Sequence, residues 1–433
     1  MEHLDDRLFA QFIAIIQSDE FSAMRRIAGD RPLPFSEFKT LPAPAGITQE
    51  QAWTLLCAMR KTVAITIPLT DAEGRRGWYS PTQSIARNLA EIDRACKENS
   101  ALDLAISSKN TTYFLLESNI DDAIEAIRGD GLSMGHERAR ELILEERLPE
   151  TPEEQLFANV RRVQHALPEI AEEPCTPAVI FDIYERVAEG VGAQEHDSIP
   201  EQPLIWQKGR LAQEDALQLV AEIVEGTQVD RNEHPLLLAQ CVRHIFMSYL
   251  PLPAWNGAVA ALCMKLLYLR AGLPVLVHVP IMKAQRDWMS GLYRPPAVAV
   301  GPQDSETLID GEVDFTAYVD VYTKLVTLKL AEMKAEFDRI VRRDIKLSHE
   351  LQGTIDVNHR QRMLLQQALD NPEAVFRIES HRAMNNIAYA TARADLLGLV
   401  ERGFLRKKKA DHAFVFTVPS DLRQSLSSFL GAS

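Results

Sequence analysis

Hydrophobic residues recur at helical spacing along most of the chain. Over residues 4–17, Leu4, Leu8, Phe12 and Ile15 return every three or four positions, as on one face of an amphipathic helix. Further helical patterns cover 49–60, 81–98, 212–225, 234–249 and 315–347. Strand-like segments are few: Val275–Pro280, Phe376–Ile378 and Phe414–Val418. The pattern predicts a mainly α protein with a small amount of β structure.

Capping residues and turn-forming residues set the expected boundaries of several elements. Thr82 or Ser80 can cap the helix over 81–98. Thr176 followed by Pro177 predicts a helix start that runs on to Glu189. Prolines at 32, 34, 42 and 44 break the chain after the first helix, and the polar segment 301–312 predicts a loop.

Composition places the chain among ordinary globular proteins. With 433 residues, 46% hydrophobic and 25% charged, it predicts two or three domains. The five cysteines are scattered without a C-x-x-C pair, which favours a reducing compartment over disulfides or a zinc site. The first residues are acidic, unlike a signal peptide, and no apolar run approaches the ~20 residues of a membrane span. We therefore expect a cytoplasmic protein with no membrane contact.

Charge is unevenly distributed along the chain. The whole sequence carries −14, whereas residues 359–433 contain 11 Lys and Arg against 7 Asp and Glu, a net charge of +4. The first 358 residues therefore carry −18. An acidic body repels nucleic acid, so any contact with DNA is expected in the last 75 residues.

The segment Leu250–Ala258, LPLPAWNGA, lies between two apolar helical runs, Leu236–Tyr249 and Val259–Gly272. This arrangement resembles the active-site loop of the Fic family, HPFxDGNGRxxR, which joins two core helices. Pro251, Asn256 and Gly257 match the motif. The resemblance implies an all-helical Fic-like core.

The reactive residues of that motif are replaced. Leu250 stands at the catalytic histidine, Ala254 at the metal-holding acid and Trp255 at the first loop glycine, while Ala258 and Ala261 stand at the two arginines. Fic enzymes typically transfer a nucleotide phosphate group, usually AMP, to a protein hydroxyl. The resemblance therefore implies an ancestry in AMP transfer and a site that has lost its usual chemistry.

Each replacement removes a specific function. A positioned base accelerates proton transfer by about 10²–10⁴-fold, and Leu250 has no lone pair. Ala254 offers no oxygen to a divalent cation, and the two alanines cannot hold phosphate as arginines do. Backbone N–H groups after Gly257 remain as an anion site in principle, although a bulky Trp255 crowds it. We expect no metal and no cofactor, a core position for Trp255, and Asn256 as a cap of the following helix.

Other segments carry the resemblance over roughly residues 80–433. His234–Leu237, Leu266–Pro274 and Ile281–Leu292 are similar to the helices that flank the motif. The segment 117–126 resembles the inhibitory helix of the family, in which Glu125 corresponds to the glutamate that pairs with the second arginine. Because Ala261 replaces that arginine, we expect a solvated Glu125. The nearby Gly-Asp-Gly at 129–131 is interpreted as a turn.

The C-terminal residues resemble a winged helix-turn-helix, a module that many Fic relatives carry. Helices are expected over 360–369 and 379–386, the second capped by Ser380, followed by a recognition helix from Tyr389 to Gly403. Ala392, Leu396 and Leu399 face the core in this prediction. The candidate DNA contacts are Tyr389, Thr391 and Arg393 on the helix, and Arg406, Lys407, Lys408 and Lys409 at a wing tip over 406–412.

The sequence thus predicts an N-terminal helical region (1–79), a Fic-like helical domain (80–310), a helical connector (311–354) and a winged helix-turn-helix with a small β-hairpin (355–433). The leading functional hypothesis is a catalytically inactive Fic-like regulator that binds DNA. Two alternatives remain: a scaffold that binds a protein partner or a second copy as a homodimer, and an AMP transferase with an altered active site. Three lysines on a hairpin are also consistent with a solvated turn.

Overall fold

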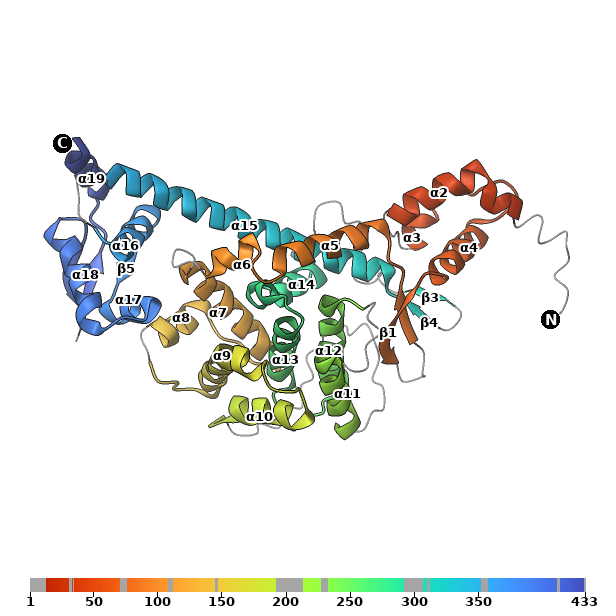
Figure 1. The fold of residues 1–433 in the computed structure, drawn as a ribbon, viewed down its shortest axis with the longest axis horizontal. Helices are drawn as coiled ribbons and strands as arrows, with labels where there is room; N and C mark the ends of the chain where they lie inside the picture. Colours follow the sequence, from red (N-terminus) through yellow and green to blue (C-terminus); the bar gives the residue numbers. More distant parts are fainter. Residues whose placement is uncertain are drawn as a thin grey trace.

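The computed structural model describes residues 13–30, 33, 35–70, 76–107, 112–144, 147–191, 213–226, 233–291, 307–309, 312–351, 357–410 and 413–431. The fold is mainly helical with few short strands, as the sequence predicts. Figure 1 shows an elongated molecule with a central helical body, an N-terminal lobe at one end and a C-terminal module at the other. Of the helix expected over 4–17, residues 13–17 are helical and 4–12 lie outside the described residues.

The N-terminal lobe contains α2 (Asp19–Asp30), α3 (Phe35–Phe38) and α4 (Gln49–Lys61). These helices enclose a small core of their own, built around Met24, Phe38 and Leu56. Helix α4 begins with a capping box, in which Thr48 and Gln51 each accept a hydrogen bond from the other's backbone N–H. The lobe is therefore a separately packed unit.

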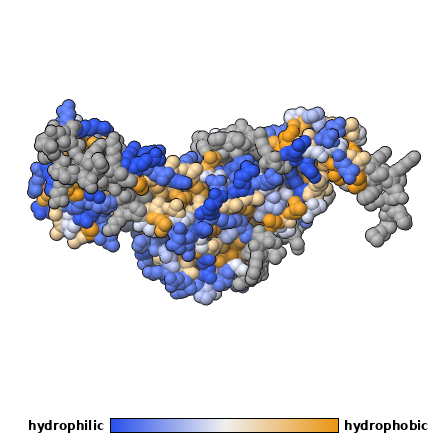
Figure 2. Space-filling model, turned by 45° about the horizontal axis from the view of Figure 1, so that its top comes forward, coloured by the Kyte–Doolittle hydropathy of each residue, from blue (hydrophilic) through white to orange (hydrophobic). Residues whose placement is uncertain are grey.

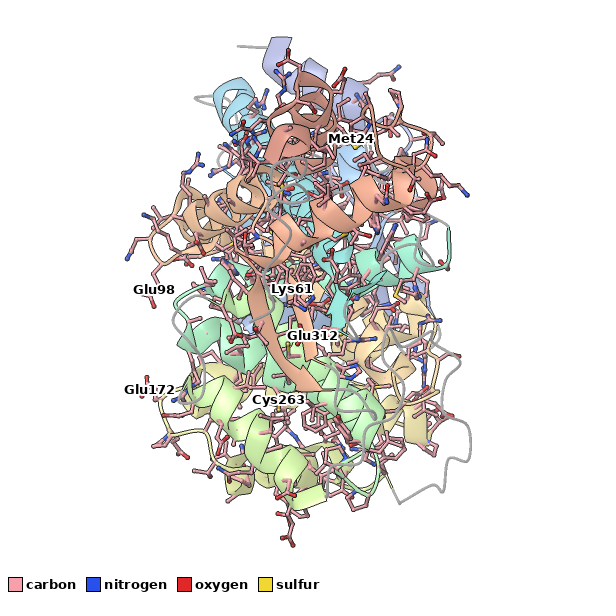
Figure 3. The ribbon with its side chains drawn as sticks, turned by 90° about the vertical axis from the view of Figure 1, so that its right-hand side faces the viewer. Met24, Lys61, Glu98, Glu172, Cys263 and Glu312 are labelled. Atoms are coloured by element: carbon pink, nitrogen blue, oxygen red, sulfur yellow. The ribbon has the colours of Figure 1, made fainter. Side chains whose placement is uncertain are left out.

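A four-stranded sheet joins the lobe to the body. Its strands are β1 (Ile65–Thr70), β2 (Arg76–Tyr79), β3 (Thr307–Ile309) and β4 (Glu312–Asp314), in the order β1-β2-β4-β3. Strands β2 and β4 run parallel, while the other pairs are antiparallel. Lys61 at the end of α4 forms an ion pair of 3.3 Å with Glu312, and both side chains are labelled in Figure 3.

The prediction of a loop over 301–312 is wrong where the structure describes it, because residues 307–309 and 312 are in strands. The pairing of β4 with β2 joins residues more than 200 positions apart, so no local pattern announces it. Residues 301–306 and 310–311 lie outside the described part of the chain. The sheet therefore contains strands from three of the expected domains: β1 and β2 from 1–79, β3 from 80–310 and β4 from 311–354.

The central body is built from helices that surround one buried helix, α13 (Asn256–Arg270). Its other elements are α5 (Gln83–Cys96), α6 (Ala101–Ile106), α7 (Thr112–Arg128), α8 (His136–Leu144), α9 (Pro152–Ile170), α10 (Pro177–Ala188), α11 (Gln213–Glu225), α12 (Pro235–Tyr249), the 3₁₀ helix η2 (Pro274–His278) and α14 (Ile281–Met289). Figure 1 shows α13 between α12 on one side and α7 and α9 on the other.

Helix α13 is buried all round because its sequence is apolar all round. Every residue from Asn256 to Tyr268 is buried, including Cys263, which is labelled in Figure 3. Lys265 is the one charged residue in that stretch. Its ammonium donates to Asp122 of α7 at 2.8 Å and to the Val277 carbonyl at 2.7 Å, which satisfies the buried charge.

Local signals predicted several boundaries of the body. The hydroxyls of Thr82 and Thr176 cap α5 and α10, and Pro177 occupies the first turn of α10. The strand expected over Val275–Pro280 is wrong, because this segment forms the 3₁₀ helix η2, with backbone bonds three residues apart from Leu276 to Leu273 and onward. A proline at its first position suits a helical turn as well as an extended end.

The long helix α15 (Thr316–Leu351) connects the body with the C-terminal module. Its first half packs along α5, and Leu325, Leu330, Met333 and Phe337 lie in the core, whereas Leu328 is half-buried. The segment expected to be a connector therefore contributes to the core of the body before it reaches the module.

The C-terminal module contains α16 (His359–Asp370), β5 (Val375–Phe376), α17 (Ile378–Asn385), α18 (Tyr389–Glu401), β6 (Arg406–Ala410), β7 (Ala413–Thr417) and α19 (Leu422–Gly431). Ala392, Leu396 and Leu399 of α18 are fully buried in a separate core. The strands form an antiparallel sheet in the order β5-β7-β6.

Two details of this module differ from the prediction. Residues 406–409 lie within strand β6 and not at the tip of the hairpin, because they pair with β7 along their whole length. The tip itself, 411–412, lies outside the described residues. Ser380 does not cap α17, whose N-cap residue is Arg377 without a side-chain cap bond.

The surface of the molecule is mixed. Figure 2 shows hydrophilic and hydrophobic residues interspersed on the face that it draws. In the described part of the chain, no helix has the length and apolar character needed to cross a membrane.

Candidate functional site

The loop between α12 and α13 is the candidate site, and two bulky residues hold its ends in a left-handed conformation. Leu250 has φ 46° and ψ 59°, and Trp255 has φ 59° and ψ 30°. A positive φ is uncommon for residues other than glycine, and it is rarest for residues with bulky side chains. The backbone at Trp255 therefore keeps a conformation that glycine adopts most easily, although the residue is tryptophan.

The Trp255 side chain is buried and belongs to the main core, which agrees with the predicted core position. Leu250, by contrast, is 36% exposed at the mouth of the loop. Ala258 and Ala261 are buried within α13, and Ala254 is half-buried. Leu250, Ala254, Ala258 and Ala261 carry no polar side-chain atom that can act on a substrate.

Asn256 braces the loop from within and does not cap the helix as expected. Its Oδ1 accepts from the Leu252 N–H at 3.0 Å, and its Nδ2 donates to the Leu252 carbonyl at 2.9 Å. Both ends of the Asn256 amide therefore form hydrogen bonds within the loop. The N-cap residue of α13 is Trp255, which makes no side-chain cap bond.

The carboxylate of Asp130, from the turn after α7, caps α13. Its Oδ1 accepts from the Gly257 N–H at 2.7 Å, and its Oδ2 accepts from the Ala258 N–H at 2.8 Å. The first turn of a helix presents such N–H groups to anions, and it is the usual place for a bound phosphate or carboxylate. A side chain of the protein itself therefore fills the anion site of α13.

Two glycines in close contact allow the turn that carries Asp130 to approach the start of α13. A Cβ added to Gly257 would lie 2.6 Å from the carbonyl carbon of Gly129 and 2.8 Å from its Cα. A Cβ added to Gly129 would lie 3.1 Å from the Cα of Gly257. The turn after α7 is thus seated directly on the backbone of α13, with no room for a side chain between them.

Asp130 is half-buried, and its surroundings change the pKa of its carboxyl group. Burial raises the pKa of Asp130 to about 7, although the backbone N–H groups of Gly257 and Ala258 and the charge of Arg243 act to lower it. Arg243 of α12 lies deep in the same region, where burial lowers the pKa of its guanidinium. It also donates to the sulfur of Met282 at 3.3 Å.

Glu125 is buried, so the prediction of a solvated side chain is wrong. It is 8% exposed, and its Oε1 lies 2.7 Å from Arg286 Nη1 on α14 and 3.4 Å from Arg128 Nε. Burial raises the pKa of Glu125, against the charges of Arg286 and Arg128. Arg286, which lies outside the motif, supplies the positive charge that Ala261 cannot.

The residues around the loop do not fit the divalent cation that the Fic resemblance implies. Ala254 has no donor atom, and Asp130 is occupied by backbone N–H groups. Among the residues that the structure describes, no group of three or more His, Cys, Asp or Glu side chains is arranged to hold a metal ion. We derive no metal-dependent step.

The candidate DNA contacts lie on one module but in two different settings. On α18, Tyr389 and Arg393 are exposed and Thr391 is half-buried, near a helix start whose N-cap residue, Ala388, makes no side-chain cap bond. On β6, Lys408 and Lys409 are exposed. Arg406 pairs with Asp421 at 3.3 Å, and Lys407 lies 3.7 Å from the ring centroid of Phe414.

A buried aspartate fixes α18 to its neighbours. Asp395 accepts from Arg360 Nε at 2.6 Å, from Asn358 Nδ2 at 2.7 Å and from His381 Nε2 at 3.1 Å. The Gln361 amide donates to the Asp395 carbonyl at 3.0 Å. These partners come from α16, its N-cap and α17, so one side chain ties three helices together.

Comparison with known proteins gives a distant likeness among solved structures. No protein-family model matches the sequence, and no curated protein matches it at the significance required. Among solved structures, a Fic family protein from Desulfovibrio desulfuricans G20 is similar, with a TM-score of 0.45 and 16% sequence identity. The likeness covers 78% of this chain and 97% of that chain. A likeness at this level carries no argument about chemistry.

Proposed function

We propose that this chain is a catalytically inactive Fic-like protein that acts as a DNA-binding regulator through a C-terminal winged helix. One observation supports the absence of catalysis: the Asp130 carboxylate accepts hydrogen bonds from the N–H groups of Gly257 and Ala258. In the motif that Leu250–Ala258 resembles, this is the helix start that faces the nucleotide phosphates. A phosphate must displace this half-buried carboxylate to reach those N–H groups.

Displacement is unfavourable for two reasons. Asp130 loses two charge-assisted hydrogen bonds, each worth about 1.5–3 kcal/mol, and the close contact of Gly129 with Gly257 holds its turn on α13. The arriving phosphate also finds no arginine at Ala258 or Ala261 to compensate. Leu250 then offers no base for the transfer step.

The DNA-binding part rests on the order of elements and the charge of the module. Helix, strand, two helices and a hairpin follow one another in α16, β5, α17, α18 and β6–β7, which is the order of a winged helix. Arg393 and Tyr389 are exposed at the start of α18, and Lys408 and Lys409 project from the wing strand. The net charge of +4 over residues 359–433 favours phosphate contact, whereas residues 1–358 carry −18.

Fluorescence anisotropy with a labelled duplex of random sequence tests this part. We expect binding that weakens steeply with salt, and substitution of Lys408 and Lys409 by Ala to lower the salt slope by about 2. Lys97→Ala, an exposed lysine of the body, serves as the matched control and leaves the slope unchanged. Salt-independent binding, or equal loss in the control, contradicts DNA contact through the module.

The scaffold hypothesis remains the second candidate, because α8 of the body packs on α17 and can hold the module in a purely structural role. A protein partner or a homodimer that forms without DNA, together with no salt-sensitive retention of duplex, favours it. The AMP-transferase alternative requires nucleotide binding, which the closed helix start opposes.

A further inference from the structure

Arg393 differs from the other arginines of the C-terminal module, because it is exposed and has no partner among the residues that the structure describes. The others pair with aspartates, donate to backbone carbonyls or have further contacts. Arg360, for example, pairs with Asp395 at 2.6 Å, and Arg402 donates to the Gly398 carbonyl at 2.7 Å. A paired arginine must break its pair before it binds DNA, whereas Arg393 gives up only water.

Arg393 lies near the N-terminal end of α18, on the side of the helix that faces away from the module core. Its exposed neighbours on that side are Ala390 and Ala394, whose side chains are short. The Arg393 guanidinium and the Tyr389 ring therefore extend farthest from this part of the helix. A helix with its side chains is about 10–12 Å across and the major groove is about 12 Å wide, so this surface can enter the groove.

The charge along α18 indicates which end of the helix approaches DNA. Glu401 in the last turn is exposed, and phosphates repel its carboxylate. Arg393 lies toward the other end, where the helix dipole is positive. Helix α17 lies between α18 and α8, so α18 is on the side of the module away from the acidic body (Figure 1). The N-terminal half of α18 is therefore the part of this helix best placed to contact bases.

The chemistry of the guanidinium selects the base that fits it. Guanine presents two acceptors, O6 and N7, side by side in the major groove, and a planar guanidinium donates to both at once. Adenine presents an amino donor in place of O6, so one of the two hydrogen bonds is lost. A bidentate contact of this kind favours the correct base by about 5- to 150-fold.

We infer that Arg393 reads a guanine in the major groove, through hydrogen bonds from its guanidinium to O6 and N7. Lys408 and Lys409 of the wing strand, which are exposed ammonium groups, contact phosphates and carry no sequence information. This inference rests on the proposed function and adds a sequence preference to it. If Arg393 contacted only phosphate, it would add affinity without preference.

Selection from a library of duplexes with a random central segment, at low salt and with the full chain, tests the inference. We expect the wild-type protein to enrich sequences that share a guanine at one position. Arg393→Ala is expected to lose that preference and to keep salt-sensitive binding, because the phosphate contacts remain. Arg87→Ala is the matched control and keeps the preference, since Arg87 is an exposed arginine of α5 that also has no partner among the described residues.

Fluorescence anisotropy with one enriched duplex then measures the contact itself. Replacing the shared guanine by adenine is expected to weaken wild-type binding by about 5- to 150-fold and Arg393→Ala binding by less than about twofold. A 7-deazaguanine at the same position lacks N7 and should weaken only the wild-type complex. Arg393→Lys keeps the charge without the planar pair of donors, so it should lose most of the preference. The base replacements change the DNA alone, so they test the contact even if a variant perturbs the module.

The possible failures separate this inference from the proposed function. Salt-sensitive binding without an enriched guanine overturns the inference, and so does a guanine preference that survives in Arg393→Ala. Wild-type affinity that 7-deazaguanine leaves unchanged overturns the contact with N7 as well. All three results leave the proposed function standing. Absence of salt-sensitive binding by the full chain contradicts the proposed function, and the inference with it.

Discussion

The carboxylate of Asp130 lies where α13 presents its first backbone N–H groups, 2.7 Å and 2.8 Å from the nitrogens of Gly257 and Ala258. Two residues with no side chain to interpose, Gly129 and Gly257, bring the turn and the helix together. At the scale of single residues, the closure of the loop thus depends on one acid and two glycines. Each can be changed separately.

The raised pKa of Asp130 leads to a prediction about how the free energy of unfolding depends on pH. Burial raises its folded pKa to about 7, whereas an aspartate in an unfolded chain has a pKa of about 3.9. Between these values the folded state binds more protons, so the free energy of unfolding falls as pH rises, by up to about 1.4 kcal/mol per pH unit. This stabilisation is complete below about pH 4 and is lost as pH rises through about 7.

We therefore expect Asp130→Asn to remove this contribution to the pH dependence between pH 5 and 7, as measured by urea unfolding. Other buried acids titrate as well, so the relevant quantity is the difference between the wild-type and variant slopes. Asp182→Asn, on the surface of α10, is the control and keeps the wild-type slope. An unchanged slope in Asp130→Asn contradicts the buried setting of this carboxyl.

The tight packing at Gly257 leads to a prediction about substitution by alanine. Alanine normally stabilises a helix relative to glycine by about 1 kcal/mol. Here its Cβ meets the Gly129 backbone at 2.6 Å, and backbone cannot move aside as a flexible side chain can. We expect Gly257→Ala to lower the free energy of unfolding by about 1–3 kcal/mol.

Gly135→Ala is the matched control for that substitution, because nothing lies within 4 Å of its added Cβ and its φ is not positive. Denaturant unfolding of both variants gives the comparison. Equal stability of the two contradicts the tight seating of the turn on α13.

At the scale of elements, α18 is held in the C-terminal module by a polar brace as well as by its apolar face. Asp395 is buried and is bonded to Arg360, Asn358 and His381. Burial alone raises the pKa of Asp395, but the bonds from these three partners outweigh it and hold the pKa below its usual value. The brace therefore stabilises the module above about pH 4 and is lost as solutions become more acidic than the folded pKa.

We expect Asp395→Asn to destabilise the module by about 2–4 kcal/mol, because the Arg360 charge loses its partner and His381 its bond. Hydrogen exchange in α16, α17 and α18 measures the effect where it occurs. Asp421→Asn, which removes only the exposed pair with Arg406, should cost no more than about 1 kcal/mol. Equal exchange in the two variants would show that the apolar face alone holds α18.

Elements with local signals could be predicted from the sequence, and elements with distant partners could not. Thr82 and Thr176 cap α5 and α10 because capping needs only neighbours in the chain. Strand β4 gains its partner β2 from more than 200 residues away, so the sequence predicts only a loop over 301–312, where β3 and the first residue of β4 lie. The alternating valines of η2 predict a strand because the segment is too short to show a longer pattern.

The sequence predicts only part of the candidate site, again because some of its residues come from distant parts of the chain. The lost motif residues are visible in the sequence, whereas Asp130 and Arg286 reach the site only through the packing of α7 on α13 and of α14 on α7. One signal did exist. The sequence of α13 is apolar all round, so the N–H groups of its first turn are expected to be buried and to need an acceptor.

At the scale of the whole molecule, the acidic body separates the N-terminal lobe from the basic C-terminal module (Figure 1). Residues 1–358 carry a net charge of −18, and their repulsion restricts DNA to the module. Affinity is therefore expected to be modest at physiological salt and to rise sharply as salt is lowered. The same body contains the closed loop, far from the surface that would contact DNA.

The central claim is that the loop before α13 is closed to nucleotides. Thermal unfolding of the full chain with ATP, ADP or AMP, each with and without magnesium, tests it most directly. A bound nucleotide at a hundred times its dissociation constant stabilises a protein by about 2.7 kcal/mol. We predict no stabilisation at millimolar nucleotide under any of these conditions. A magnesium-dependent, saturable rise in Tm contradicts the closed site and requires Asp130 to leave the first turn of α13.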